Sequence, residues 1–404
     1  MRTRLIRWST ATLAVLALAC GAWLLWPDDA APPRMGMDPS ALLTALASDT
    51  DGFAEVGPAW EYAFPSDYGP HFDYRTEVWD LSGAIADVGG RRYGVRLTFL
   101  RIGLVPRDQQ RPSELAANSV MLARFALASE DGDRARTAQR ISRAAAGLAG
   151  AERMRVWLED WSLGRAGDDA LVLEAKTDEM RLSLKLLSEK AAVTGDQIGL
   201  FDGPAGGDGP GFHYFLQPRL TAIGRLMIGS SGRSDLDGET VAVTGDAWLE
   251  RAWGSTVGGL SGARGQLLLN RFSLQLDDGS ELMCIHLRRR DGGGTPLPTC
   301  LAITGSGDRR LFQRRELTLE PAVEPGRGHR AGTGYPLNWR LALPALGLDL
   351  SLRPLLVDQE IELGLSAGPP QWSGALSLAG SRGDEAVTGS GRMDLNGYEA
   401  DAGT

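Results

Sequence analysis

Apolar and polar residues alternate with a period of two through most of the chain after residue 52, and this alternation limits the fold more than any other feature. The runs 95–100 and 272–277 show the pattern clearly. Side chains of a β-strand point alternately to opposite faces, so the pattern is typical of strands with one buried face. The chain also holds 52 glycines, many of them in turn-forming pairs between such runs. We therefore expect an all-β protein of antiparallel strands, as in a sandwich or a barrel.

The segment Arg134–Leu148 departs from this alternation. It carries alanine, arginine and glutamine residues at helical spacing. This spacing predicts either a short helix or a loop with one helical turn.

The length of 404 residues supports two domains, at about 100–200 residues for each. Breaks rich in glycine and aspartate at 202–211 and 229–238 place the boundary near residue 225. We expect one barrel at 51–225, a second at 226–396 and a tail at 397–404. The net charge of −9 opposes long-range attraction to nucleic acid, so we expect no nucleic-acid partner.

The N-terminus predicts export across a bacterial inner membrane. Arg2, Arg4 and Arg7 precede an uncharged apolar stretch at 8–26, which as a helix of about 28 Å is long enough to span the hydrocarbon core. Three interpretations remain open: an uncleaved signal anchor at 1–26, a lipoprotein acylated on Cys20, and a cleaved signal peptide. All three deliver the chain across the inner membrane, and residues 27–50 are then a linker. In the first, the rest of the chain stays anchored on the periplasmic side of the membrane.

Common catalytic motifs are absent from the sequence. It has no phosphate-binding glycine loop with its lysine, no dinucleotide-binding fingerprint, no HExxH or CxxC metal motif and no G-x-S-x-G elbow. Its four histidines are widely scattered. We therefore expect neither a metal nor a cofactor.

Tryptophan and carboxylate residues lie close together on several predicted strands. Glu77 and Trp79 share one face of a strand, and so do Trp248 and Glu250. If these faces line a barrel interior, they form an apolar cavity in which a carboxyl pKa rises, and both glutamates become candidate acids. In the alternative interpretation, the tryptophans fill the barrels and the charges pair as buried arginine–carboxylate bridges.

Several segments resemble the carotenoid 1,2-hydratase (hydroxyneurosporene synthase) family and its branch of lipocalin-like secreted bacterial proteins. The family pattern F-P-x-D-H-G-x-H corresponds to Phe64–His71, and T-E-W-W-Y-x-T-G corresponds to Thr76–Gly83. The pattern G-x-A-W-M-D-H-E-W-G corresponds to Gly245–Gly254, and F-S-x-Q-L-D-D-G to Phe272–Gly279. The resemblance runs in order from about residue 60 to 375.

The resemblance implies two tandem lipocalin- or calycin-like barrels and, as the named activity, addition of water to an isoprenoid double bond. That reaction needs an acid in an apolar pocket, for which Glu77 and Glu250 are the candidates. It also implies handling of lipid in the cell envelope, with a lipoprotein-releasing type of ABC transporter as a partner. The candidate ligand-binding residues are Tyr68, His71, Trp79, Arg124, Trp248, Arg251, Trp253 and Gln275.

The sequence departs from the family pattern where the chemistry is expected. Tyr68 replaces a histidine, Arg124 stands where relatives often carry histidine, and Glu250-Arg251 replaces Asp-His. Arginine stays protonated and cannot shuttle protons. We therefore place binding of an apolar or amphipathic lipid or isoprenoid first, a hydratase-like enzyme (a hydro-lyase) second and an interaction scaffold third.

Two pairings follow from the residues. A buried Glu77 needs a positive partner, which we expect to be Arg124, Arg251 or Arg271. A hairpin centred on Gly292 places Cys284 directly opposite Cys300. An oxidising periplasm would close this pair as a disulfide, whereas one extra turn residue would offset it and leave two thiols.

Overall fold

A computed structural model describes residues 51–57, 60–109, 113, 115–167, 170–195, 212–229, 240–254, 263–264, 267–289, 293, 296–322, 334–361 and 371–398. The predicted membrane segment at 1–26, the linker at 27–50 and most of the tail lie outside these residues. Within the described ranges, no helix has the length and apolarity that a membrane span requires. Antiparallel strands in two sheets make up nearly all of the regular structure, so the prediction of an all-β fold is confirmed.

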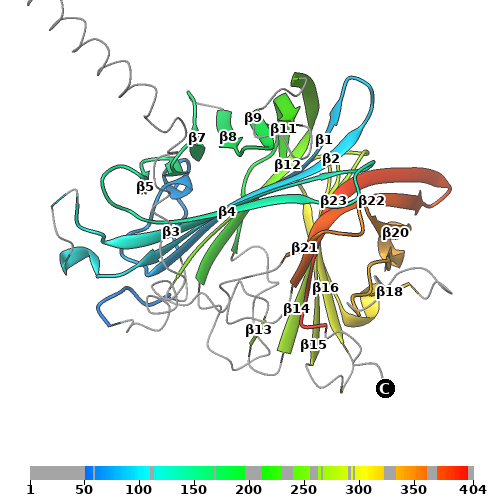
Figure 1. Ribbon diagram of the computed structural model, residues 1–404. Helices are drawn as coiled ribbons and strands as arrows, with labels where there is room; N and C mark the ends of the chain where they lie inside the picture. Colours follow the sequence, from blue (N-terminus) through cyan, green and yellow to red (C-terminus); the bar gives the residue numbers. More distant parts are fainter. Residues whose placement is uncertain are drawn as a thin grey trace, which may run out of the picture. The chain divides into compact units, whose positions relative to one another are not determined.

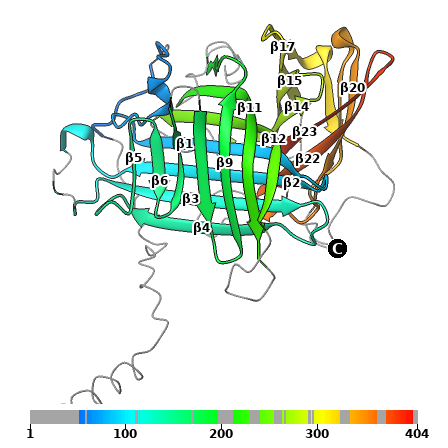
Figure 2. The same cartoon turned by 90° about the horizontal axis from the view of Figure 1, so that it is seen from above.

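Within the described residues, the first sheet has 12 strands. They are β1 (Thr76–Asp87), β2 (Arg92–Gly103), β3 (Ser119–Ser129), β4 (Arg136–Arg143), β5 (Ala149–Glu152), β6 (Arg155–Leu158), β7 (Trp161–Arg165), β8 (Ala170–Lys176), β9 (Met180–Ser188), β10 (Val193–Thr194), β11 (Phe212–Ile228) and β12 (Thr240–Gly254). Their order is β4-β3-β2-β1-β12-β11-β9-β8-β7-β6-β5, with β10 on β11. The sheet curls until β6 contacts β3 and β4, which makes it a near-closed barrel (Figure 2).

The second sheet has 11 strands in the part of the chain that the structure describes. They are β13 (Ala263–Arg264), β14 (Leu267–Leu276), β15 (Glu281–Arg289), β16 (Leu297–Ile303), β17 (Arg309–Gln313), β18 (Thr318–Pro321), β19 (Trp339–Leu343), β20 (Leu348–Pro354), β21 (Glu360–Ile361), β22 (Gln371–Arg382) and β23 (Glu385–Asn396). Their order is β17-β16-β15-β14-β23-β22-β20-β19-β18, and the sheet forms a half-barrel. The 3-10 helices are η1 (Ser66–Tyr68), η2 (Arg107–Gln109), η3 (Arg314–Glu316) and η4 (Pro344–Leu346).

The chain passes from one sheet to the other between Gly254 and Ala263, which is well beyond the boundary expected near residue 225. β11 runs through that position without a break, and β12 lies in the first sheet between β1 and β11. The glycine-rich segment 229–238 therefore joins two neighbouring strands. It does not separate two domains.

The segment expected to contain helix holds the edge strand β4, so that prediction was wrong. β4 pairs with β3 from Arg136 to Arg143. The open edge of β3 offers this segment a complete set of backbone partners, and such pairing readily overrides a weak helix propensity.

Alternation along the strands produces three buried layers. One apolar cluster fills the concave side of the first sheet and another fills that of the second. A third cluster lies between the outer faces of the two sheets, on β10, β11 and β12 of the first and β15 and β16 of the second. At the same junction, β1 contacts β23 and β2 contacts β22 (Figure 1). At Gly94, an added Cβ would lie 2.2 Å from the Cβ of Ala375, so the sheets approach there more closely than any side chain allows.

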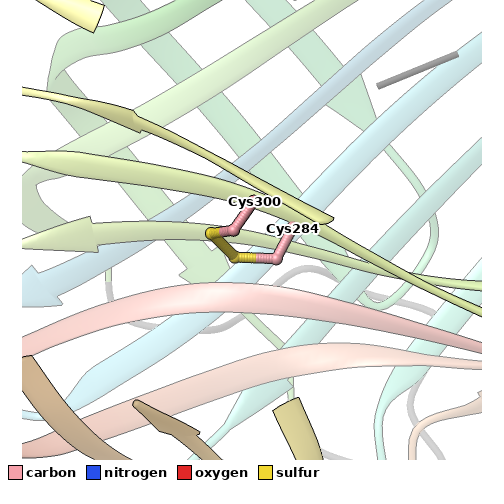
Figure 3. Close-up of a disulfide and its surroundings, with 2 residues drawn as sticks. All are labelled: Cys284 and Cys300. Atoms are coloured by element: carbon pink, nitrogen blue, oxygen red, sulfur yellow. A yellow bond between two sulfur atoms is a disulfide. The ribbon is translucent and has the colours of Figure 1, made fainter. Parts of the chain in front are cut away.

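A disulfide joins Cys284 and Cys300 inside the second sheet (Figure 3). The two residues lie directly opposite each other on β15 and β16, as the hairpin register required, and both are fully buried.

Candidate functional site

All of the predicted ligand-binding and acid residues except Gln275 lie on two opposite faces of the first sheet. Trp79 lies opposite Arg251 in the β1/β12 ladder, and Asp80 lies opposite Glu250, so the two pairs face different ways. The concave side holds Tyr68, His71, Glu77, Trp79, Arg251 and Trp253. The outer side holds Arg124, Trp248 and Glu250, whereas Gln275 lies on β14 of the second sheet and lines the cleft between the sheets. The residues therefore do not line one common cavity.

Glu77 is fully buried, and both of its carboxylate oxygens are hydrogen-bonded. Arg101 Nε donates to Oε1 at 2.7 Å, and Arg251 Nη2 donates to Oε2 at 3.0 Å. The backbone N–H of His71 also donates to Oε2, at 2.8 Å. Arg251 is thus one of the three expected partners.

Arg101 is the partner that the sequence analysis missed. It continues the odd-numbered set of Leu97 and Phe99 on β2, so its inward direction was visible in the alternation. Among the described residues, Arg124 hydrogen-bonds to Gln139, and Arg271 binds Glu250 of the first sheet and Asp394 of the second.

The pKa of Glu77 shifts in the opposite direction from the one expected of an acid. Burial by itself raises this pKa, but Arg101, the hydrogen bond from His71 and Arg251 together lower it below its ordinary value. The side chain is therefore ionised at neutral pH and has no proton to donate.

Aromatic rings and ion pairs fill the space around Glu77. His71 stacks on Trp253 with 3.9 Å between ring centroids, and its Nε2 lies 3.1 Å from Asp67 Oδ1. The guanidinium of Arg251 lies 3.8 Å from the ring centroid of Trp79. Asp67, which lies in the quoted 64–71 motif, is a further buried residue of the site that the sequence analysis did not single out. The rings and ion pairs of this cluster thus pack together and stabilise one end of the barrel.

A second group of charges lies between the two sheets and is formed by three carboxylates and three arginines. Its members are Asp80, Glu250, Asp394, Arg96, Arg271 and Arg392. Arg392 Nη1, from the second sheet, lies 2.9 Å from Asp80 Oδ2 in the first. Arg271 binds Glu250 across the same junction. Burial raises the pKa values of Asp80 and Asp394, but the arginines outweigh it and lower both.

A cleft lies beside these charges, between the outer faces of the two sheets. It is bordered by small residues such as Gly83, Ala126 and Gly374, and it opens to solvent. Its cavity volume is about 40 Å³, which holds a few water molecules. Trp248 also lines it, and within the described part of the chain the buried indole Nε1 of this residue has no hydrogen-bond partner.

Gln275 also lines the cleft, but its side-chain amide is already hydrogen-bonded within the protein. Its Nε2 donates to the backbone oxygens of Pro218 and Ala247. In the part of the chain that the structure describes, no group of three or more His, Cys, Asp or Glu side chains is arranged to hold a metal ion.

Two curled antiparallel sheets packed on their outer faces define a class of lipocalin-like β-proteins. The model of the AttH-like family matches residues 55–398, and the chain belongs to this family. A search of curated proteins finds no match.

Two solved structures share this fold. The crystal structure of a protein of Nitrosomonas europaea described as AttH has a TM-score of 0.70 and 27% sequence identity, covering 86% of this chain and 100% of that one. Kievitone hydratase from Nectria haematococca has a TM-score of 0.58 and 15% identity, covering 85% of this chain and 95% of that one. The second likeness concerns the fold alone. Both matches are consistent with the resemblance to the carotenoid 1,2-hydratase family.

Proposed function

We propose that the protein binds an apolar or amphipathic small molecule, of lipid or isoprenoid type, at the cleft between its two sheets. The observation that carries this proposal is the cleft lined by Trp248, whose buried indole N–H has no acceptor among the described residues. A buried donor without a partner is costly. An oxygen atom of a ligand would remove that cost.

The barrel interior is a weaker candidate, because large side chains already fill it. Trp79, Phe99, Phe125 and Trp161 all belong to the apolar cluster there, and none is more than 3% exposed. The cleft, by contrast, is lined by small side chains and opens to solvent. Because its cavity is small, a ligand larger than a few water molecules must extend from it along the adjoining surface.

The hydratase alternative has less support from the geometry. Protonation of an isoprenoid double bond needs an acidic group in contact with the substrate. Glu77 is ionised between two arginines, and Glu250 is hydrogen-bonded to Arg271 and Ser273. The scaffold alternative does not account for a cleft that is lined by small side chains and opens to solvent.

The cellular setting is part of the proposal. The N-terminal segment 1–26 would tether the protein to the periplasmic side of the inner membrane, where a lipoprotein-releasing type of ABC transporter would be its partner. The Cys284–Cys300 disulfide supports an oxidising compartment.

Native mass spectrometry of gently purified protein tests the proposal. We expect a co-purifying lipid or isoprenoid on the wild type and its loss from Ala126→Trp, because the larger ring fills the cleft beside β3. Val88→Trp is the matched control, since Val88 is 90% exposed and does not line the cleft. Folded wild type that binds no lipid or isoprenoid, either as purified or after incubation with one, would refute the proposal.

A further inference from the structure

The outer face of the first sheet changes from polar to apolar in regular steps beside the cleft. Neighbouring residues of β2, β3 and β4 form rungs across the strands, and successive rungs lie about 7 Å apart. In order along the strands, the rungs are Arg96/Ala126/Thr137, Thr98/Arg124/Gln139 and Leu100/Leu122/Ile141. All three share one face, because they are separated by two residues.

The first rung borders the cleft, and the third forms an apolar shelf. Leu100, Leu122 and Ile141 are half-buried and pack on the buried pair Ile102 and Val120. The second rung, with Arg124, lies between the cleft and this shelf. From the cleft outward, the rungs thus change from polar to apolar side chains. An amphiphile that lies along the strands with its head group toward the cleft would match this order.

Positive charge exceeds negative charge at the second rung. The three buried carboxylates between the sheets are already matched by Arg96, Arg271 and Arg392. Arg124 stands diagonally next to Arg96 as a fourth guanidinium, and its hydrogen bond goes to the neutral Oε1 of Gln139 at 3.0 Å. Among the described residues, no carboxylate forms an ion pair with it. A guanidinium favours a carboxylate over any neutral partner.

We infer that the ligand is an anionic amphiphile whose carboxylate is bound by Arg124 at the mouth of the cleft, with its hydrocarbon chain on the shelf of Leu100, Leu122 and Ile141. This inference rests on the proposed function and adds the chemical class of the ligand. The occupant is a single free molecule, because half-buried side chains on a sheet face next to a cleft suit one chain better than a membrane surface.

Titration calorimetry with decanoate and with decan-1-ol, which differ only in the head group, tests the inference. The wild type should bind decanoate at least about tenfold more tightly than decanol, because hydrogen bonds to charged groups are the stronger ones. Arg124→Gln should abolish this difference by weakening decanoate alone, and Arg124→Lys should restore part of it. Leu122→Asn should weaken both ligands. Arg340→Gln is the matched control, since Arg340 pairs with Asp349 at an exposed site on the second sheet.

Equal affinity of the wild type for the two ligands would overturn the inference, and so would an Arg124→Gln variant that retains the preference for decanoate. If both ligands bind equally and Ala126→Trp abolishes both, the proposed function stands and the anionic class fails. If neither binds and no lipid co-purifies, both fail. Loss of binding to anionic lipid vesicles in Arg124→Gln, with binding of decanoate unchanged, would also overturn the inference in favour of a membrane surface.

Discussion

Asp80 and Glu250 lie directly opposite each other on β1 and β12, and both side chains are buried on the face toward the second sheet. Like charges in this position destabilise a sheet. Asp80 is paired within its own sheet by Arg96 of β2, and Arg392 of the second sheet adds a second guanidinium. Among the described residues, the ion pair of Glu250 comes from Arg271 of the second sheet. Glu250 therefore needs the second sheet docked on the first for its charge to be paired, and we expect the two sheets to unfold as one cooperative unit.

Replacing Arg271 by methionine should destabilise the protein strongly. The substitution leaves Glu250 and Asp394 buried without the guanidinium that joins them, which costs about 3–5 kcal/mol. Urea denaturation measures the loss. Arg340→Met, which breaks an exposed pair with Asp349, should cost no more than about 1 kcal/mol. Equal losses of unfolding free energy in the two variants would show that the buried charges between the sheets contribute no more to stability than an exposed ion pair does.

The free energy of unfolding should decrease as the pH falls from about 6.5 to about 4. Burial lowers the pKa of His213 to about 4, and also that of His286, from an ordinary value of 6.5. Within this window the unfolded chain binds protons that the folded chain does not, so each histidine contributes a slope of about 1.4 kcal/mol per pH unit.

Urea denaturation at several pH values between about 4.5 and 7 checks this slope. The double variant His213→Gln/His286→Gln should have a flatter profile in the same window. A wild-type profile that is already flat would contradict neutral burial of the two imidazoles.

Changing Glu77 to glutamine should lower stability without changing ligand affinity. The substitution leaves Arg101 and Arg251 buried with one negative charge fewer, at a cost of about 3–5 kcal/mol. Affinity should stay constant because Glu77 lies on the opposite face of the first sheet from the cleft. Asp349→Asn is the control, because that carboxylate is half exposed. An unchanged melting temperature would show that the Glu77 charge is not needed.

Removing the disulfide with Cys284→Ala/Cys300→Ala should lower the free energy of unfolding by about 3 kcal/mol on the loop-entropy model, for a sequence separation of 16 residues. The double variant avoids leaving one buried free thiol. Thiol titration of denatured, unreduced wild-type protein provides an independent measurement. Two free thiols in addition to any at Cys20 would show that the bridge does not form in the exported protein.

Properties that depend on residues near one another in sequence could be predicted from the sequence alone. Period-two alternation identified the β-class, because a strand displays its pattern within a few residues. The hairpin arithmetic that placed Cys284 opposite Cys300 succeeded for the same reason, since a short turn sets the register of its two strands. The shared face of Glu77 and Trp79 is equally local. The β4 segment was mispredicted because its backbone partners lie on β3 and its helix propensity is weak.

The tertiary structure decided which faces meet. The sequence shows that Trp248 and Glu250 share a face, but only the β1/β12 register shows that this face lies behind the one that carries Glu77. That register joins strands far apart in the chain, and no local pattern encodes it. Whether Arg124 forms an ion pair likewise depends on the tertiary structure. Docking of the second sheet decides which carboxylates lie near each arginine, and therefore which arginines are paired.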